Sequence, residues 1–430
     1  MFAPVTVRRS LSRAARAHAP EDAQARGDRV PVLDGLRGLA IILVFLAHAI
    51  REPLQPGTAS IDVALRAIAY TGWIGVDLFF VLSGFLISGI LLDTRGQPGW
   101  WPNFIVRRAL RIFPLYYGAL TVLFVFLPWL VRWSNPDFVT LQANQRWYWT
   151  YTVNLLAALT DGRGTPLYTS HLWSLSIEEQ FYLIWPFFVW VCRPRTLLRV
   201  AALAVIAGLA FRLGLVLHDP LNGRAAYWLM PGRLDSLMTG AALAVLARSP
   251  GGLLRLAPLA PLGLGAGVFA LCALVLSRGG LDVRDPVVAI AVYPVVALVF
   301  GSLLVMALTA PPTGALVRAL SCESLGKWGK YSYAIYLVHY PLLAAIESKT
   351  TFYQREVALL GGSRLPSVLL LAALTMALSY LLGWLSYHLY EKRFLSLKRY
   401  FTCRPTVRDE STQQRETEHA RGSRSFARAS

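Results

Sequence analysis

The sequence is poor in charge and in cysteine. Charged residues make up only 15% of its 430 positions, and acidic residues (24) are far fewer than basic ones (42). Its four cysteines show no CxxC or other paired spacing, so the sequence predicts neither a zinc site nor a disulfide framework. We expect no metal. With 55% hydrophobic residues and a mean hydropathy of +0.47, the composition excludes an ordinary soluble enzyme.

Long apolar segments joined by short polar ones follow one another along the chain. The basic residues stand mostly beside these segments, so the lipid bilayer accounts for them and no nucleic-acid partner is needed. We expect an all-α polytopic transmembrane bundle of about ten spanning helices. The stretch 145–158 is too short to span and rich in Trp and Tyr, which predicts an interfacial or re-entrant helix. The predicted spans are 32–50, 71–92, 109–131, 171–191, 197–217, 230–247, 258–277, 286–309, 330–347 and 366–390.

The distribution of basic residues predicts the orientation. Placing both termini in the cytoplasm puts most Lys and Arg on the cytoplasmic side of a cell (inner) membrane. This gives a cytoplasmic N-terminal tail at 1–31, a membrane domain at 32–394 and a charged cytoplasmic tail at 395–430. Both tails are predicted to be disordered.

The first apolar segment carries two ionisable residues. Arg37 and His48 are eleven residues apart, which on a helix brings them within about 20° of the same face and about 16 Å apart along the axis. Ionisable groups inside a span are costly and usually functional. The alternative is that Arg37 is a positive-inside anchor and His48 an interfacial histidine.

Two further segments add a carboxylate and a pair of guanidinium groups. Asp77 is expected near the depth of His48, where a carboxylate could orient the imidazole as a general base. It could also be a simple interfacial aspartate. Arg108 and Arg111 share nearly one helix face and suit phosphate, although a positive-inside cluster would look the same.

Adjacent carboxylates stand out in the fourth predicted span. Glu178 and Glu179 lie seven or eight residues into an apolar helix, about 10–12 Å deep. Tyr182 is one turn from Glu178, and Ser176 precedes Glu179 by three residues. Carboxylates at this depth should face a cavity or a partner, so we interpret them as functional.

Two later predicted spans also carry polar residues. Arg233 and Asp235 suggest an internal ion pair or a substrate contact. His339 and Tyr336 share a face at a spacing of three residues, and this histidine is as easily packed core as catalytic.

A series of motifs in this chain resembles the acyltransferase-3 family. These proteins are integral membrane acyltransferases that acylate cell-surface glycans and some small molecules. The motifs occur in family order from Val32 to Phe394: LDGLRGLAIILVFLAH, GVDLFFVLSGFLI, RRALRIFPLYY, WSLSIEEQFYLIWP, RLDSLMTG, SYAIYLVHYPL and SYHLYEKRF.

The resemblance implies a reaction and a set of roles. Acyl-CoA, most simply acetyl-CoA, would donate its acyl group from the cytosol to a hydroxyl of a glycan or related acceptor outside. By position, His48 would be the general base, oriented by Asp77 or Glu179, with an acyl-histidine intermediate as the mechanistic rival. The remaining assignments are CoA binding by Arg37, Arg108 and Arg111, and acceptor binding by Ser176, Tyr182, Arg233 and Asp235.

Two other classes of protein remain open. A transporter or flippase of a glycan or lipid-linked substrate also buries charged residues, but we find no internal repeat of the kind many transporters show. A non-catalytic membrane sensor would need no CoA.

Overall fold

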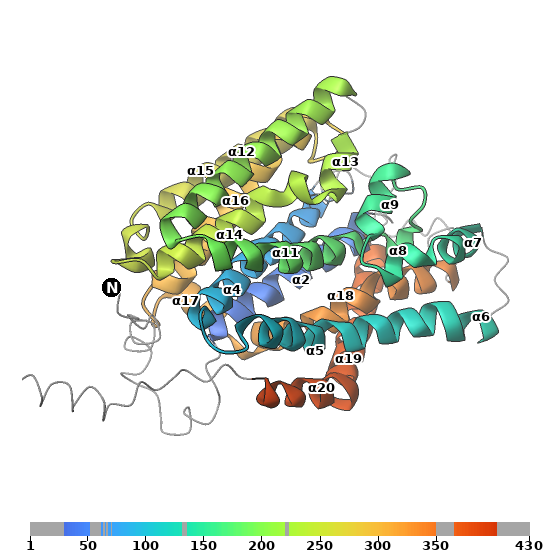
Figure 1. Ribbon diagram of the computed structural model, residues 1–430. Coiled ribbons are helices and arrows are strands. Elements are labelled where there is room, and N and C mark those ends of the chain that lie inside the picture. The colour runs from blue at the N-terminus through green and yellow to red at the C-terminus, as the bar shows by residue number, and fades with distance from the viewer. Residues whose placement is uncertain are drawn as a thin grey trace, which may run out of the picture.

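The computed structural model describes residues 30–51, 71–130, 136–219, 223–349 and 365–401, with isolated positions at 62, 65, 68 and 69. Every regular element in these ranges is a helix, as the apolar segments predict (Figure 1). A helix satisfies its own backbone hydrogen bonds within one segment, which explains why segments that lie in lipid are helical.

Seven helical segments are long and apolar enough to cross a membrane. The prediction of about ten is therefore not confirmed by length and composition within the described ranges. The segments are built on α2 (Pro31–Arg51), α4 (Gly75–Thr94), α5 (Trp100–Thr121), α12 (Pro194–His218), α15 (Ala260–Arg278), α16 (Pro286–Thr309) and α19 (Leu365–Ser386).

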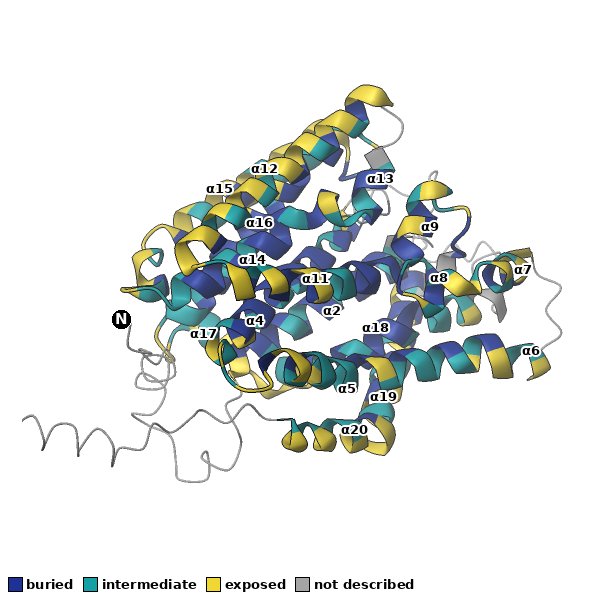
Figure 2. Cartoon of the chain, viewed as in Figure 1, coloured by how far each residue is buried: buried dark blue, intermediate teal, exposed yellow. Residues whose placement is uncertain are grey.

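The other three predicted spans are helices that fall short of this standard. They are α11 (Trp173–Val191), α14 (Leu234–Ala247) and α18 (Glu323–Lys349). Helix α14 has only 14 residues, while α11 contains two adjacent glutamates and α18 several polar side chains. These helices lie among their neighbours, with α14 packed on α4, α12 and α16, and much of their surface is buried (Figure 2). Contact with protein in place of lipid explains their polar residues.

The predicted helix at 145–158 is two short helices. They are α8 (Gln145–Trp149) and α9 (Val153–Leu159), flanked by α7 (Pro136–Ala143) and α10 (Leu167–Ser170). The break between them falls at Tyr151, whose φ of 53° is left-handed and cannot continue a helix. Each piece is too short to span, in line with the predicted non-spanning role. They gather at one end of the bundle, beside α13 (Gly223–Trp228) (Figure 1).

Close glycine contacts set the register of the central helices. On α18, a Cβ at Gly329 would collide with the carbonyl of Asp34 and approach Gly38 on α2. Ten residues beyond this contact on both helices, His48 meets His339, so α2 and α18 run in the same direction. On α4, a Cβ at Gly84 would collide with the carbonyl of Leu237 on α14, so these two helices also approach closely.

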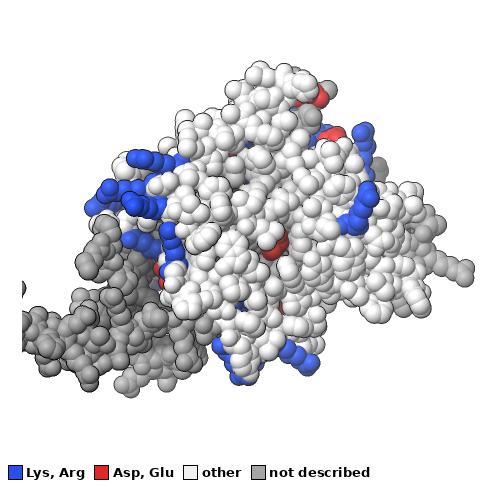
Figure 3. Space-filling model, viewed as in Figure 1, with Lys and Arg blue, Asp and Glu red and all other residues white. Residues whose placement is uncertain are grey.

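Basic side chains gather at one end of the molecule, with smaller groups at the opposite end and along the lower edge of the view, and the face between them carries little charge apart from acidic atoms near its centre (Figure 3). The chain continues past the predicted domain boundary at 394, through π-helix η7 (Tyr387–Glu391), α20 (Lys392–Ser396) and 3-10 helix η8 (Leu397–Tyr400). This segment lies against α5, where Arg107 donates to the carbonyl of Lys398 (3.4 Å). The rest of both predicted tails, 1–29 and 402–430, lies outside the described residues.

Candidate functional site

A cavity of about 100 Å³ lies between α2, α4, α5, α11 and α18. Three guanidinium groups line it, and so do two carboxylates and several hydroxyls. We call it the arginine cavity. Its polar lining residues are Arg37, Ser83, Arg108, Arg111, Ser174, Glu178, Glu179, Tyr182, Ser332, Tyr333 and Tyr336. The sequence placed these arginines and glutamates on separate helices, and the fold brings them together.

The two glutamates of the cavity have different environments. Glu178 is held in a small network, because Ser83 Oγ donates to its Oε1 (2.8 Å) and Tyr182 OH donates to its Oε2 (3.1 Å). The Oε1 of Glu179 is buried and accepts no hydrogen bond from the described residues. Arg108 lies within electrostatic range of both carboxylates, with its guanidinium 5.6 Å from the Tyr182 ring centre. Glu179 is therefore the carboxylate with capacity for another partner.

The arginine end of the cavity has an excess of positive charge. Arg37 is 3.5 Å from Asp34, a partly exposed pair one turn apart on α2. Arg108 and Arg111 face the same space from α5. Half-buried Lys398, from the C-terminal segment, lies within electrostatic range of all three. Like charges gathered in this way favour an anion.

At its other end the cavity closes on a pair of hydroxyls. Ser174 Oγ and Tyr336 OH are 2.6 Å apart, and Tyr336 OH donates to the carbonyl of His171 (2.9 Å). The Tyr336 ring centre is 5.2 Å from that of His171 and 5.6 Å from that of His339. The Ser174–Tyr336 pair thus separates the arginine cavity from a group of imidazoles.

This histidine cluster consists of His48, His171 and His339. The Nδ1 of His48 lies 3.0 Å from the Nε2 of His339, and the His48 ring stacks on Tyr340 with centroids 4.2 Å apart. His171 lies 5.2 Å from His339, centre to centre. Neither of its ring nitrogens reaches hydrogen-bonding geometry with a described residue, although the carbonyls of Tyr336 and Leu337 are close. Three imidazoles therefore meet where the sequence analysis expected one.

Neither carboxylate that we expected beside His48 lies there. The α2–α4 packing places Gly72 against Ala47, so Asp77 stands more than a turn deeper in the bundle than His48. Glu179 lies six residues, about 9 Å, inside α11, whereas His171 lies two residues before that helix begins. His48 and Asp77 were expected at the same depth. They differ in depth because the second span begins at the level of Ala47, and Asp77 lies further along it, deeper in the bundle.

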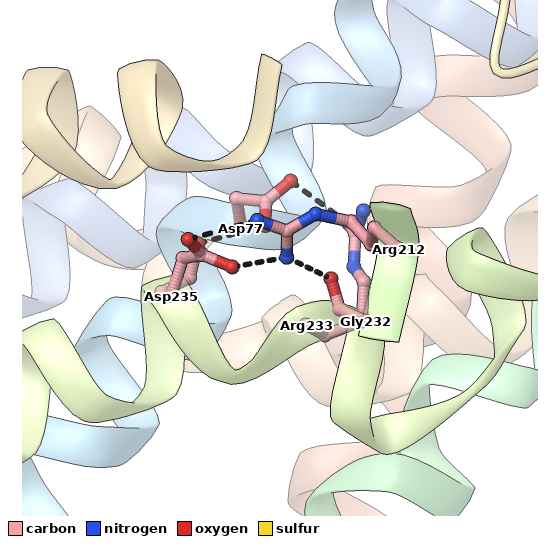
Figure 4. Close-up of polar contacts among 6 residues, drawn as sticks. Asp77, Arg212, Gly232, Arg233 and Asp235 are labelled. Carbon is pink, nitrogen blue, oxygen red and sulfur yellow. Dashed lines mark hydrogen bonds and ion pairs between the residues drawn. The ribbon is translucent and has the colours of Figure 1, made fainter. Parts of the chain in front are cut away.

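Asp77 belongs instead to a buried set of ion pairs (Figure 4). Its Oδ2 accepts from Arg233 (2.8 Å) and its Oδ1 from Ser236 (2.8 Å). Asp235 pairs with Arg212 on α12, so the expected Arg233–Asp235 pair is replaced by two crossed pairs. All four charged side chains are at most 2% exposed.

Aromatic rings surround the Arg233 guanidinium. Five ring centres lie 4.5–5.6 Å from it, those of Trp73, Phe80, Trp173, Tyr227 and Tyr293. Such cation–π contacts stabilise a desolvated cation. With its carboxylate partner, this environment marks Arg233 as a structural centre that ties α4 to α14.

The sequence analysis missed several of the residues now in the site. Ser83 is not among the residues singled out from the sequence, but its hydroxyl binds Glu178. Arg212 is another residue that the sequence analysis did not name, although an arginine inside a predicted span indicates a buried partner.

Ser176, which the sequence analysis assigned to acceptor binding, lies elsewhere. It is fully buried, its Oγ has no partner among the described residues, and it does not line the arginine cavity.

Comparison with known proteins identifies the family. Residues 30–384 match the family described as an acyltransferase domain. The chain belongs to the acyltransferase-3 family. The match includes α2 with its Arg37 and His48, and ends inside α19.

Curated proteins that are similar to the chain include named O-acetyltransferases. Peptidoglycan O-acetyltransferase OatA of Listeria monocytogenes is 30% identical over 346 residues, 73% of this chain and 49% of the relative. O-acetyltransferase OatA of Staphylococcus aureus (strain NCTC 8325) is 28% identical over 345 residues, 74% of this chain and 51% of the relative. The chain thus spans about half the length of these relatives. No solved structure matches it.

Proposed function

We propose that this chain is a membrane O-acyltransferase that moves an acyl group, most simply acetyl, from acyl-CoA to a hydroxyl of a cell-surface or lipid-linked glycan. The observation that carries the proposal is the arginine cavity itself. It joins an anion-binding end to a hydroxyl pair that contacts the histidine cluster. One substrate could therefore be held at the arginines while its reactive end approaches the imidazoles.

Arg37, Arg108 and Arg111 would bind the phosphates of CoA. A guanidinium group donates a planar pair of hydrogen bonds that matches phosphate geometry. The excess of positive charge, with Lys398 nearby, suits the several negative charges of CoA. We place this end in the cytoplasm, where the basic residues of a membrane protein concentrate.

His48 would act as the general base on the acceptor. Its imidazole takes the proton of the acceptor hydroxyl while that oxygen attacks the thioester carbonyl carbon. The carbon–sulfur bond then breaks, and the departing thiolate recovers the proton from the imidazolium. The acyl group has moved from sulfur to oxygen, and His48 has returned to its neutral form.

The acceptor side rests on the relatives. The Listeria relative is named for peptidoglycan, a glycan with free hydroxyls. Glycan hydroxyls would approach the end of the bundle where α8, α9 and the histidine cluster lie. Glu179 and Tyr182 face the cavity and would contact the donor, whereas Ser176 does not line the cavity.

The deciding experiment uses the purified full-length chain in liposomes, labelled acetyl-CoA and a peptidoglycan-type oligosaccharide. His48→Ala should lower the transfer rate by about 10²-fold to 10⁴-fold, the usual contribution of a general base. His218→Ala is the matched control, since this exposed histidine at the end of α12 lies outside both the cavity and the cluster. Transfer by His48→Ala at the wild-type rate would refute the role of His48. Glycan movement across the liposome without acyl transfer would favour a transporter.

A further inference from the structure

His339 is completely buried on α18, and its polar contacts fix where its proton lies. Its Nδ1 is 2.8 Å from the carbonyl oxygen of Tyr336 and 3.2 Å from that of Ile335. A carbonyl oxygen can only accept a hydrogen bond, so Nδ1 must carry the hydrogen. The ring is therefore assigned as the Nδ1–H form from its hydrogen-bond partners.

The other nitrogen of His339 is then an acceptor. A charged imidazolium would be costly here, because no polar contact of His339 with the described residues is a carboxylate and aromatic rings surround it. In the neutral form Nε2 has a lone pair, and it lies 3.0 Å from the Nδ1 of His48. That short contact requires a hydrogen on the His48 nitrogen, which places the basic lone pair of His48 on its Nε2.

We propose that His339 is a positioning residue that holds His48 in the tautomer with a basic Nε2 and fixes the plane of its ring. The inference rests on the proposed function, in which His48 is the base. The Tyr336 carbonyl orients His339, and His339 orients His48, in the role that the sequence analysis gave to Asp77 or Glu179. Stacking of His48 on Tyr340 supports the same ring orientation.

Two isosteric variants separate the positioning role from a packing role. Gln at 339 can place its Oε1 near the position of the imidazole Nε2 and accept the same hydrogen from His48. Asn at 339 can place its amide nitrogen near Nδ1 and keep the bond to the Tyr336 carbonyl, but it offers nothing toward His48. Both are buried polar amides, so the cost to folding should be similar.

In the liposome assay His339→Gln should keep kcat within about 10-fold of wild type. His339→Asn should lower kcat by roughly 10²-fold, approaching the loss of the base itself. The KM for acetyl-CoA should change little in either, because the arginine cavity is untouched. Equal kcat for the Gln and Asn variants, or wild-type kcat for His339→Asn, would overturn the inference.

A spectroscopic readout tests the tautomer without activity. Nitrogen NMR of protein labelled at histidine should show His48 protonated at Nδ1 in wild type and His339→Gln, and a mixture of tautomers in His339→Asn. A wild-type signal with the proton on Nε2 would overturn the inference. If His48→Ala is fully active, the proposed function fails. If His48→Ala is inactive but His339→Gln and His339→Asn have the same kcat, only the positioning role of His339 is refuted.

Discussion

The sharpest test of the buried charges is the replacement of Asp77 by alanine. The sequence suggested Asp77 as a partner of His48, the proposed base, but the structure pairs it with Arg233 and Ser236, both at 2.8 Å. If the pairing is its role, Asp77→Ala should damage the fold, and activity should fall only as folded protein is lost.

The expected loss of stability in Asp77→Ala follows from the burial of the ion pair. Arg233 and Asp77 are both 0% exposed, so removing the carboxylate leaves a cation with no counter-ion in a desolvated site. Breaking one side of such a pair costs about 3–5 kcal/mol. For a chain of this size that corresponds to a fall in Tm of roughly 3–6 °C. The five surrounding aromatic rings offset part of the cost, which favours the lower end of that range.

Thermal unfolding of the purified protein in detergent measures the effect, with the double variant Asp77→Leu, Arg233→Met as the control. Replacing both buried charges by apolar groups is often nearly neutral, so the double variant should regain most of the lost Tm. A wild-type Tm for Asp77→Ala combined with lost acyl transfer would refute this reasoning and restore Asp77 to the catalytic group.

Further predictions concern the cavity and the register of the helices. Arg108→Ala and Arg111→Ala should each raise the KM for acetyl-CoA by about 10-fold or more in the liposome assay, because a charge-assisted hydrogen bond contributes about 1.5–3 kcal/mol; unchanged KM values would contradict phosphate binding. Lys398→Ala should raise the same KM by a smaller factor, while exposed Lys392→Ala should not. Gly329→Val should lower the free energy of unfolding by about 1–3 kcal/mol, measured by thermal unfolding, because the new side chain meets the α2 backbone; an unchanged Tm would disprove that close contact.

Much of the arginine cavity could be predicted from the sequence. The spacing of Arg108 and Arg111 and the depth of Glu178 and Glu179 follow from helix geometry within one segment. The glutamates pointed to a cavity or a partner and the arginines to a phosphate, and all four line the same cavity. The helical fold could also be predicted from single segments, because the length and hydropathy of a segment indicate whether it can span a membrane.

Contacts between helices were beyond this reasoning. His48 and Asp77 were expected to pair because they lie on consecutive predicted helices. The order of two helices in the chain determines neither the depth of a residue in the bundle nor the helix face on which it meets its partner. The partner of His48 comes from a helix 291 residues away. Arg233 and Asp235 were expected to pair because they lie close in the sequence, and each instead binds a charge on another helix.

The parallel packing of α2 and α18 links the guanidinium end of the arginine cavity to the histidine cluster. Gly329 meets α2 near Gly38, one residue from Arg37, and ten residues later along both helices His48 meets His339. At 1.5 Å per residue, this places the glycine contact and the histidine pair about 15 Å apart along the axis. In the proposed mechanism this helix pair sets the distance from the guanidinium end to the base. A donor held by its phosphates at one end would extend into the bundle to meet the acceptor at the other, so the register of α2 on α18 would matter to the site as much as the side chains themselves.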